Sequence, residues 1–235
     1  MSKHERLQKI LSAYGITSRR AAESLILESR VCINGVTATL GQSARPYIDE
    51  ITVDGVKALG NAEHKYIMLN KPRGYLTTLR DDRGRKTVME LIADLGVRVY
   101  PVGRLDYNSE GLLLFTNDGR FANAVSHPSG GKKKTYEVLV RGDAAKAAKL
   151  LSEPVSVDGH FLQAANVSLV LESADGGVLI ITIAEGKNRQ IRKMCAACGV
   201  SVRALKRISI GPVELGSLET GKWRFLTEEE VRSLG

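Results

Sequence analysis

The run from Gly103 to Gly119 constrains the fold of this chain more than any other segment. Its apolar part, Gly111 to Thr116, leads into the turn sequence Asn117-Asp118-Gly119, and this pattern predicts a buried strand. Asp106 lies just before that strand. A carboxylate at such a loop is held firmly while its oxygens face a cleft, so we interpret Asp106 as catalytic. Taken alone, a loop-capping aspartate is the commoner interpretation.

Composition sets the outer bounds. The 235 residues suffice for one large domain, or for a small domain and a medium one. A net charge of +8 favours a polyanionic partner, although a merely basic soluble protein fits the charge equally well. No segment approaches the roughly 20 apolar residues of a membrane span, and residues 1–6 have no apolar signal core behind them. With three cysteines and no disulfide framework, we expect a cytoplasmic protein.

Residues 1–60 form a small predicted domain. Helical spacing predicts two short helices within residues 3–30, and hairpin turns are expected at Asn34-Gly35 and Asp54-Gly55. Residues 57–64 lose this periodicity and are interpreted as a linker. Cations cluster in the helical half and could dock on RNA phosphates. These candidate RNA-binding residues are Lys9, Arg19, Arg20 and Arg30.

Residues 61–235 form a larger predicted α+β domain. Its elements are strands at 66–70, 111–116, 134–141 and 178–184, a helix at 190–198, and a C-terminal helix that opens on a capping box at Thr227. Tight turns between neighbouring strands favour a mixed, mostly antiparallel sheet flanked by helices over a βαβ nucleotide fold.

Basic segments in this domain indicate an RNA surface. Loop 71–86 has six Lys/Arg against two Asp, and residues 185–194 include four cations. A cation at the start of the helix there could hold Asp106 ionised. Tyr136 follows a lysine cluster and could stack on an unpaired base, although a plain strand residue is an equally good interpretation. The candidate RNA-binding residues here are Lys71, Arg73, Lys134, Lys187 and Arg189.

Five segments in order resemble the motifs of pseudouridine synthases, in the RsuA/RluB branch that acts on ribosomal RNA. The resemblance covers almost the whole chain, with residues 1–60 similar to an S4-type RNA-binding domain. The motifs are Lys71-Pro72-Arg73-Gly74, the Gly103–Gly119 run, Lys134-Thr135-Tyr136, the basic segment 185–194, and the ending 221–227.

This resemblance implies specific roles. Asp106 would be the catalytic aspartate, and Arg104 would help to position it or the RNA. Tyr136 would stack on the flipped uracil, Arg192 would form an ion pair with Asp106, and Ile191 would pack beneath the base. A carboxylate, an aromatic and a basic surround suit extrusion and isomerisation of a base. The reaction requires no metal and no cofactor, and we expect a monomer whose partner is ribosomal RNA or an assembling ribosomal subunit.

Several alternatives stay open. The form of residues 188–192 is more similar to large-subunit members, and small-subunit ribosomal RNA is the nearest alternative target. A non-catalytic assembly factor would use only the basic surfaces. Asp106 and Glu110 could be a glycosidase pair, although few aromatics are present to bind sugars. Cys195 and Cys198 lack the second pair that a structural zinc site needs, so we interpret them as buried helical cysteines.

Overall fold

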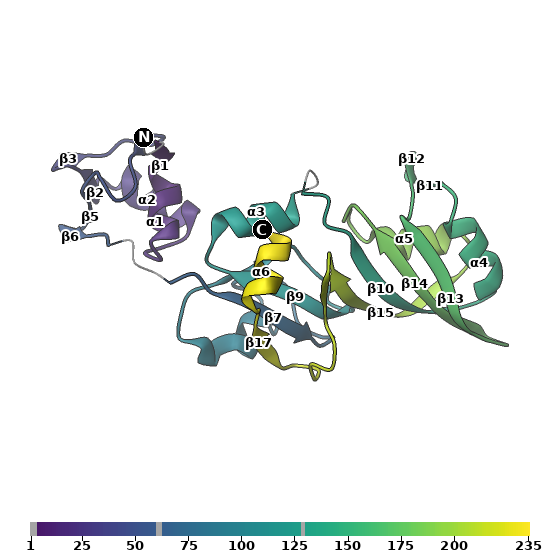
Figure 1. Ribbon diagram of the computed structural model, residues 1–235. Helices are drawn as coiled ribbons and strands as arrows, with labels where there is room; N and C mark the ends of the chain where they lie inside the picture. Colours follow the sequence, from purple (N-terminus) through teal and green to yellow (C-terminus); the bar gives the residue numbers. More distant parts are fainter. Residues whose placement is uncertain (1–3, 60–62, 128–129) are drawn as a thin grey trace. The chain divides into compact units, whose positions relative to one another are not determined.

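The computed structural model describes residues 4–59, 63–127 and 130–235 (Figure 1). The chain divides into two compact units, one of residues 1–64 with 117–119 and one of residues 65–116 with 120–235. Part of the predicted linker, residues 60–62, lies outside the described residues. Within the described parts, no helix is long and apolar enough to cross a membrane.

The first unit contains the two predicted helices, α1 (Leu7–Ala13) and α2 (Arg19–Leu27). The Ser18 hydroxyl caps α2 by accepting a hydrogen bond from the Ala21 amide at 3.1 Å. Helical periodicity was sufficient here because one apolar stripe from each helix, including Leu7, Leu11 and Ile26, is buried in a shared core.

Short strands complete this unit, in the sheet order β3-β2-β5-β6. Both predicted hairpin turns are confirmed, since Asn34-Gly35 and Asp54-Gly55 all have positive φ, as tight two-residue hairpins require. A pairing of β1 with β4 was not expected. The linker begins later than predicted, because Lys57 pairs with Thr52 in the sheet. The strands are β1 (Glu5–Arg6), β2 (Val31–Ile33), β3 (Val36–Thr37), β4 (Ser43–Ala44), β5 (Ile51–Val53) and β6 (Val56–Lys57).

The second unit is built on a nine-stranded sheet with main order β13-β14-β10-β15-β9-β7-β17, to which β8 and β16 add as side strands. All its pairings are antiparallel except β9 with β15, so the predicted mixed, mostly antiparallel α+β fold is confirmed. The strands are β7 (Tyr66–Lys71), β8 (Tyr100–Val102), β9 (Glu110–Thr116), β10 (Lys134–Arg141), β13 (Asn166–Ser173), β14 (Gly176–Ile183), β15 (Ser201–Ile210), β16 (Val213–Glu214) and β17 (Trp223–Phe225).

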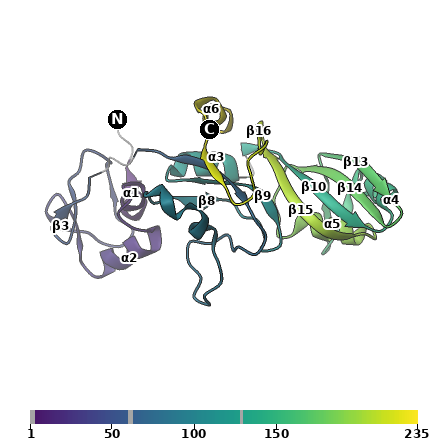
Figure 2. The same cartoon turned by 90° about the horizontal axis from the view of Figure 1, so that it is seen from below.

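Helices cover both faces of this sheet. The helices are the 3₁₀ segment η1 (Val88–Leu95), α3 (Gly119–Ser126), α4 (Ala144–Leu151), α5 (Gln190–Ala197) and α6 (Glu228–Leu234), and a separate hairpin joins β11 (Val155–Val157) to β12 (His160–Leu162). One core packs η1, α4 and α5 on the sheet, and the other packs α3 and α6 (Figures 1 and 2). Leu113 belongs to the first core, whereas Leu112 and Leu114 belong to the second. Strand β9 is therefore buried on both faces, as its apolar run indicated.

The parallel contact of β9 with β15 joins the two halves of the sheet. It consists of Glu110 opposite Lys206 and Gly111 opposite Arg207. Gly111 has a φ of +101°, and a Cβ at this position would lie 2.3 Å from the Arg207 carbonyl oxygen. Only glycine therefore allows β15 to approach β9 this closely.

We expect Gly111→Ala to destabilise the second unit by at least about 2 kcal/mol, because it adds both a strained φ and a backbone clash. Urea denaturation measures the loss. Gly159→Ala is the matched control, since Gly159 also has a positive φ, +77°, but its Cβ would meet open space. Equal losses for the two variants would show that β15 can move away without cost.

Candidate active site

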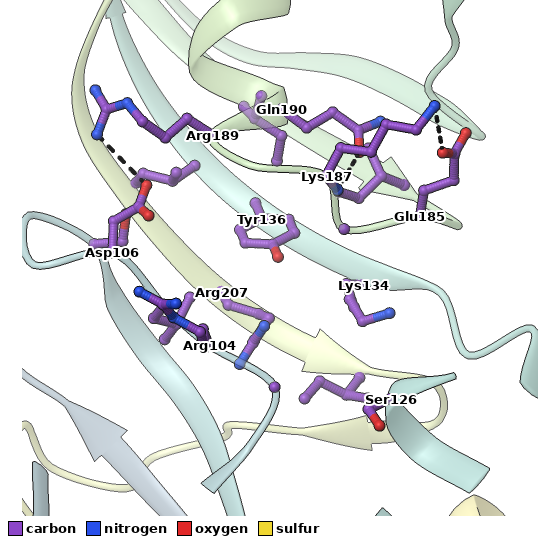
Figure 3. Close-up of a pocket in the computed structure, with 18 of the residues that line it drawn as sticks. Arg104, Asp106, Ser126, Lys134, Tyr136, Glu185, Lys187, Arg189, Gln190 and Arg207 are labelled. Atoms are coloured by element: carbon purple, nitrogen blue, oxygen red, sulfur yellow. Dashed lines mark hydrogen bonds and ion pairs between the residues drawn. The ribbon is translucent and has the colours of Figure 1, made fainter. Parts of the chain in front are cut away.

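A cleft of about 360 Å³ opens in the second unit beside Asp106 (Figure 3). Its walls come from the segment after β8, from β10 and β15, and from the segment that leads from β14 into α5. The lining is mainly apolar, with exposed charged residues at its rim and one buried arginine, Arg207. The charged and aromatic residues that line it are Arg104, Asp106, Lys134, Tyr136, Glu185, Lys187, Arg189 and Arg207.

Asp106 lies in the loop between β8 and β9, with its side chain 34% exposed. Arg189 Nη1 lies 3.6 Å from Asp106 Oδ2, and Figure 3 shows the two side chains pointing toward each other. Both partners are partly exposed, so the pair contributes about 1 kcal/mol at most. The place of the carboxylate must therefore be fixed mainly by the backbone of its loop.

The structure pairs Asp106 with Arg189 and not, as predicted, with Arg192. Arg192 Nη2 instead donates to the Asn108 carbonyl oxygen at 2.9 Å and to Ser109 Oγ at 3.3 Å. The reason is the geometry of the α5 start. Arg189 precedes the helix in a left-handed conformation and lies exposed at the rim, whereas Arg192 lies within the first turn, half-buried beside the loop. Arg192 thus holds the loop that carries Asp106, and Arg189 is the cation that forms the ion pair with the Asp106 carboxylate.

Lys71 was predicted to bind RNA, and this is wrong as well. The last residue of β7 is fully buried, and its ammonium donates to three backbone oxygens, those of Pro72 (3.0 Å), Asp106 (3.2 Å) and Ser109 (2.9 Å). All three protons are used inside the protein, which leaves none for a phosphate. Burial lowers the pKa of Lys71 to about 8, with the charges of Asp106 and Glu110 acting in the opposite direction. The lysine anchors this loop at Asp106 and at its C-terminal end, Ser109.

Tyr136 and Ile191 lie where the sequence interpretation requires them. Both line the cleft, one from β10 and one from the start of α5, and both are buried, with 7% and 3% of their surface exposed. Arg104 also lines the cleft and is exposed. The roles of these three residues stay predictions, but one cleft brings them together with Asp106.

The other predicted RNA-binding cations divide into two groups. Lys134, Lys187 and Arg189 line the cleft, with Lys187 paired to Glu185 at 2.9 Å. Outside the cleft, four cations are exposed or paired. Arg19 and Arg20 are exposed, Lys9 pairs with Glu5 at 2.8 Å, and Arg30 forms a two-point ion pair with Asp54.

Glu110 does not form a catalytic pair with Asp106. Its Oε1 lies 3.2 Å from Arg73 Nη2, and it is absent from the lining of the cleft. This also places Arg73, a predicted RNA-binding residue, in an ion pair beside the loop. Within the described residues, the cleft holds one carboxylate, Asp106, besides the paired Glu185. The glycosidase interpretation therefore lacks its second acid.

Cys195 and Cys198 are buried at the end of α5, as predicted. Burial raises the pKa of the Cys195 thiol to about 12, so it stays protonated and unreactive at neutral pH.

Sequence reasoning missed Arg207. This residue of β15 is 3% exposed, lines the cleft, and lies with its Cζ 6.0 Å from the centre of the Tyr136 ring. Its Nε donates to the Leu112 carbonyl oxygen at 2.7 Å. The signal was its even spacing from the apolar Leu205, which puts both side chains on one face of the strand.

Comparison with known proteins shows the family of this chain. Residues 65–197 match the model of a family described as RNA pseudouridylate synthase, and residues 5–46 match that of the S4 domain. A protein of Aquifex aeolicus named as an uncharacterized RNA pseudouridine synthase is 44% identical over 97% of this chain and 93% of its own length. The ribosomal large subunit pseudouridine synthase B of Bacillus subtilis is 40% identical over 98% and 95%.

A solved structure is also similar over nearly the whole chain. A crystal structure described as a pseudouridylate synthase superposes with a TM-score of 0.67 at 30% identity, and the match covers 98% of this chain and 99% of the other.

We expect Lys71→Met to lower the free energy of unfolding by roughly 3 kcal/mol, because three carbonyl oxygens lose a charged donor. Turnover should fall about 100-fold, since a small displacement of the reacting group costs that much. Chemical denaturation and a single-turnover assay measure the two effects. Lys146→Met, an exposed lysine of α4, is the control that should change neither.

The lowered pKa of Lys71 also predicts a pH dependence. In the unfolded chain Lys71 has the ordinary lysine pKa of about 10.4. Between pH 8 and about pH 10.4 the unfolded chain therefore binds more protons than the folded chain. The stability of the wild type relative to Lys71→Met should therefore rise with pH across this range. Activity should fall with a midpoint near pH 8, because a neutral amine has two protons for three carbonyls. An identical alkaline limb in Lys71→Met would contradict the assignment.

Proposed function

Because this chain belongs to the RNA pseudouridine synthase family, we propose that it isomerises one uridine of large-subunit ribosomal RNA, with Asp106 as the catalytic carboxylate. The pseudouridine synthase activity follows from the family, which spans more than half of the chain and is shared by relatives over nearly its full length. The target and the residue roles are the proposal.

The observation that carries the catalytic assignment is the way the Asp106 loop is held. Lys71 donates to the carbonyl oxygens of Asp106 and Ser109, and Arg192 donates to that of Asn108. The Asp106 carboxylate meanwhile reaches a cleft walled by Tyr136 and Ile191. A fixed backbone with a solvent-accessible carboxylate is what preorganised chemistry needs. The stable folding of this loop has no need of a free carboxylate.

The reaction matches these groups. The bond from the ribose anomeric carbon to uracil N1 breaks, the ring turns, and a bond to C5 replaces it. The Asp106 carboxylate adds to the sugar or takes a proton from it. The Tyr136 ring stacks on the uracil, and the apolar floor at Ile191 retains the detached base. Arg104 and Arg189, exposed at the rim, contact the RNA backbone around the flipped nucleotide.

Ribosomal RNA of the large subunit is supported by the Bacillus subtilis relative and by the form of residues 188–192, where Arg189 stands directly before Gln190. The S4 domain gives a second RNA contact, through the exposed arginines at the start of α2. The partner is therefore the ribosomal RNA, free or in an assembling subunit.

Mapping of pseudouridines tests this function. Carbodiimide treatment and primer extension on both ribosomal RNAs should show one large-subunit site that is lost when the gene is deleted. Wild type should restore it, Asp106→Asn should not, and Asp175→Asn, an exposed turn residue outside the cleft, is the matched control that should.

Each other outcome corrects one part. A lost site in small-subunit RNA would move the target, and no lost site would favour a binding-only assembly factor or another RNA. Restoration by Asp106→Asn would remove Asp106 from the chemistry.

A further inference from the structure

Arg207 is a buried cation whose hydrogen bonds within the protein are incomplete. Its Nε is bound to Leu112, whereas Nη2 is enclosed without a hydrogen-bond partner among the described residues, and Nη1 has none there either. A buried guanidinium left so poorly paired is costly in free energy. Stability does not explain such a residue. A ligand in the cleft does, because Nη1 is not among the enclosed atoms and can donate to it.

No carboxylate compensates this charge in the described part of the chain. Of the acidic residues in the cleft lining, Asp106 faces Arg189 and Glu185 faces Lys187. Lys134 is a second cation at the same place. Burial lowers the pKa of Lys134, and the neighbouring Arg207 charge lowers it further. In Figure 3 the Arg207 guanidinium lies below the Tyr136 ring, between Arg104 and Lys134. Arg207 and Lys134 therefore bring positive charge to the part of the cleft beside Tyr136, and the Arg207 charge is screened from water.

We propose that Arg207 donates a hydrogen bond to a carbonyl oxygen of the uracil and stabilises the negative charge that the ring carries once it has left the ribose. This rests on the proposed function. When the bond from the anomeric carbon to N1 breaks, its electron pair leaves with the uracil and is delocalised onto the carbonyl oxygens of the base. The anomeric carbon gains a bond to the Asp106 carboxylate, or a double bond to C2′ after Asp106 takes the C2′ proton. In both courses the charge ends on the ring.

Position favours the base over a phosphate as the acceptor. The exposed cations at the rim, Arg104 and Arg189, suit a hydrated phosphate, whereas Arg207 lies deep beside the aromatic ring on which the base would stack. Gly111 fixes this place, because the Arg207 backbone packs against it. A preorganised donor that meets developing charge in a dry site is the arrangement that gives large rate effects.

Single-turnover isomerisation of an RNA stem-loop that carries the mapped uridine tests the inference, followed as tritium released from C5. Arg207→Gln should lower the rate at least about 100-fold while the RNA dissociation constant stays within about threefold. Arg203→Gln removes the same charge from an exposed position of the same strand and should change neither. Arg207→Lys, which keeps the charge, should lose less than Arg207→Gln.

Substrate analogues separate chemistry from structure. In 2-thiouridine or 4-thiouridine, sulfur replaces one carbonyl oxygen of the base and is a poorer acceptor. The wild-type rate divided by the Arg207→Gln rate should therefore be smaller for the analogue that lacks the oxygen contacted by Arg207. The same ratio for all three bases, or a loss of RNA affinity equal to the loss of rate, would overturn the proposal and assign Arg207 to the fold or to a phosphate. An inactive wild type would instead refute the proposed function.

A measurement on the wild type alone avoids any folding defect of the variants. Free 5-nitrouracil is ionised at neutral pH, whereas 5-ethyluracil has similar size and is neutral. We expect the anion to inhibit isomerisation at least tenfold more tightly. Equal inhibition would overturn the proposal.

Discussion

Two residue pairs of parallel sheet decide whether this site exists. The contact of β9 with β15 at Gly111 and Arg207 joins the strands that carry the Asp106 loop to those that carry Tyr136 and the start of α5. The contact is short and depends on a glycine at φ +101°, where any side chain would meet the backbone of the opposite strand. The residues that line the cleft come from segments far apart in the chain, and the pairing of β9 with β15 makes them neighbours.

Two buried cations in the site have opposite uses. Lys71 donates all three of its ammonium protons to backbone oxygens and thereby fixes the loop that carries Asp106. Arg207 donates one hydrogen bond within the protein, from Nε, and its Nη2 has no partner among the described residues. The fully paired lysine organises the loop, whereas the partly paired arginine has donors left for a ligand in the cleft. The two residues are both long cations, and the number of hydrogen bonds that each donates within the protein distinguishes their roles.

The cations of α5 divide their work in a related way. Arg189 stands before the helix and lies exposed next to Asp106, where the pair is weak enough to yield to a phosphate. Arg192, within the first turn, holds the carbonyl of Asn108. The basic motif thus combines an RNA-accessible charge with a loop anchor three residues later.

Much of the fold could be predicted from the sequence, because its signals are local. Helical stripes, the two positive-φ hairpin turns, the alternation of 134–141 and the capping box at Thr227 each involve neighbours in the chain. The buried strand after Asp106 was predicted for the same reason. Strand β13 was not predicted because most of its residues are exposed. Strand β15 was not predicted because its main partners, β10 and β9, lie elsewhere in the chain.

The sequence by itself identified several residues that meet at the cleft, but not Arg207: an aspartate between glycines, an aromatic after lysines and a basic helix start. Only the tertiary structure decided what each cation does. Lys71, Arg192 and Arg207 carry the same charge. Lys71 binds the carbonyl oxygen of Ser109, Arg192 binds that of Asn108, and Arg207 lines the cleft. A long cationic side chain has no fixed role until its donors find acceptors, and those acceptors are backbone oxygens brought near by sheet pairing. That is why Asp106 was found from the sequence and its supports were not.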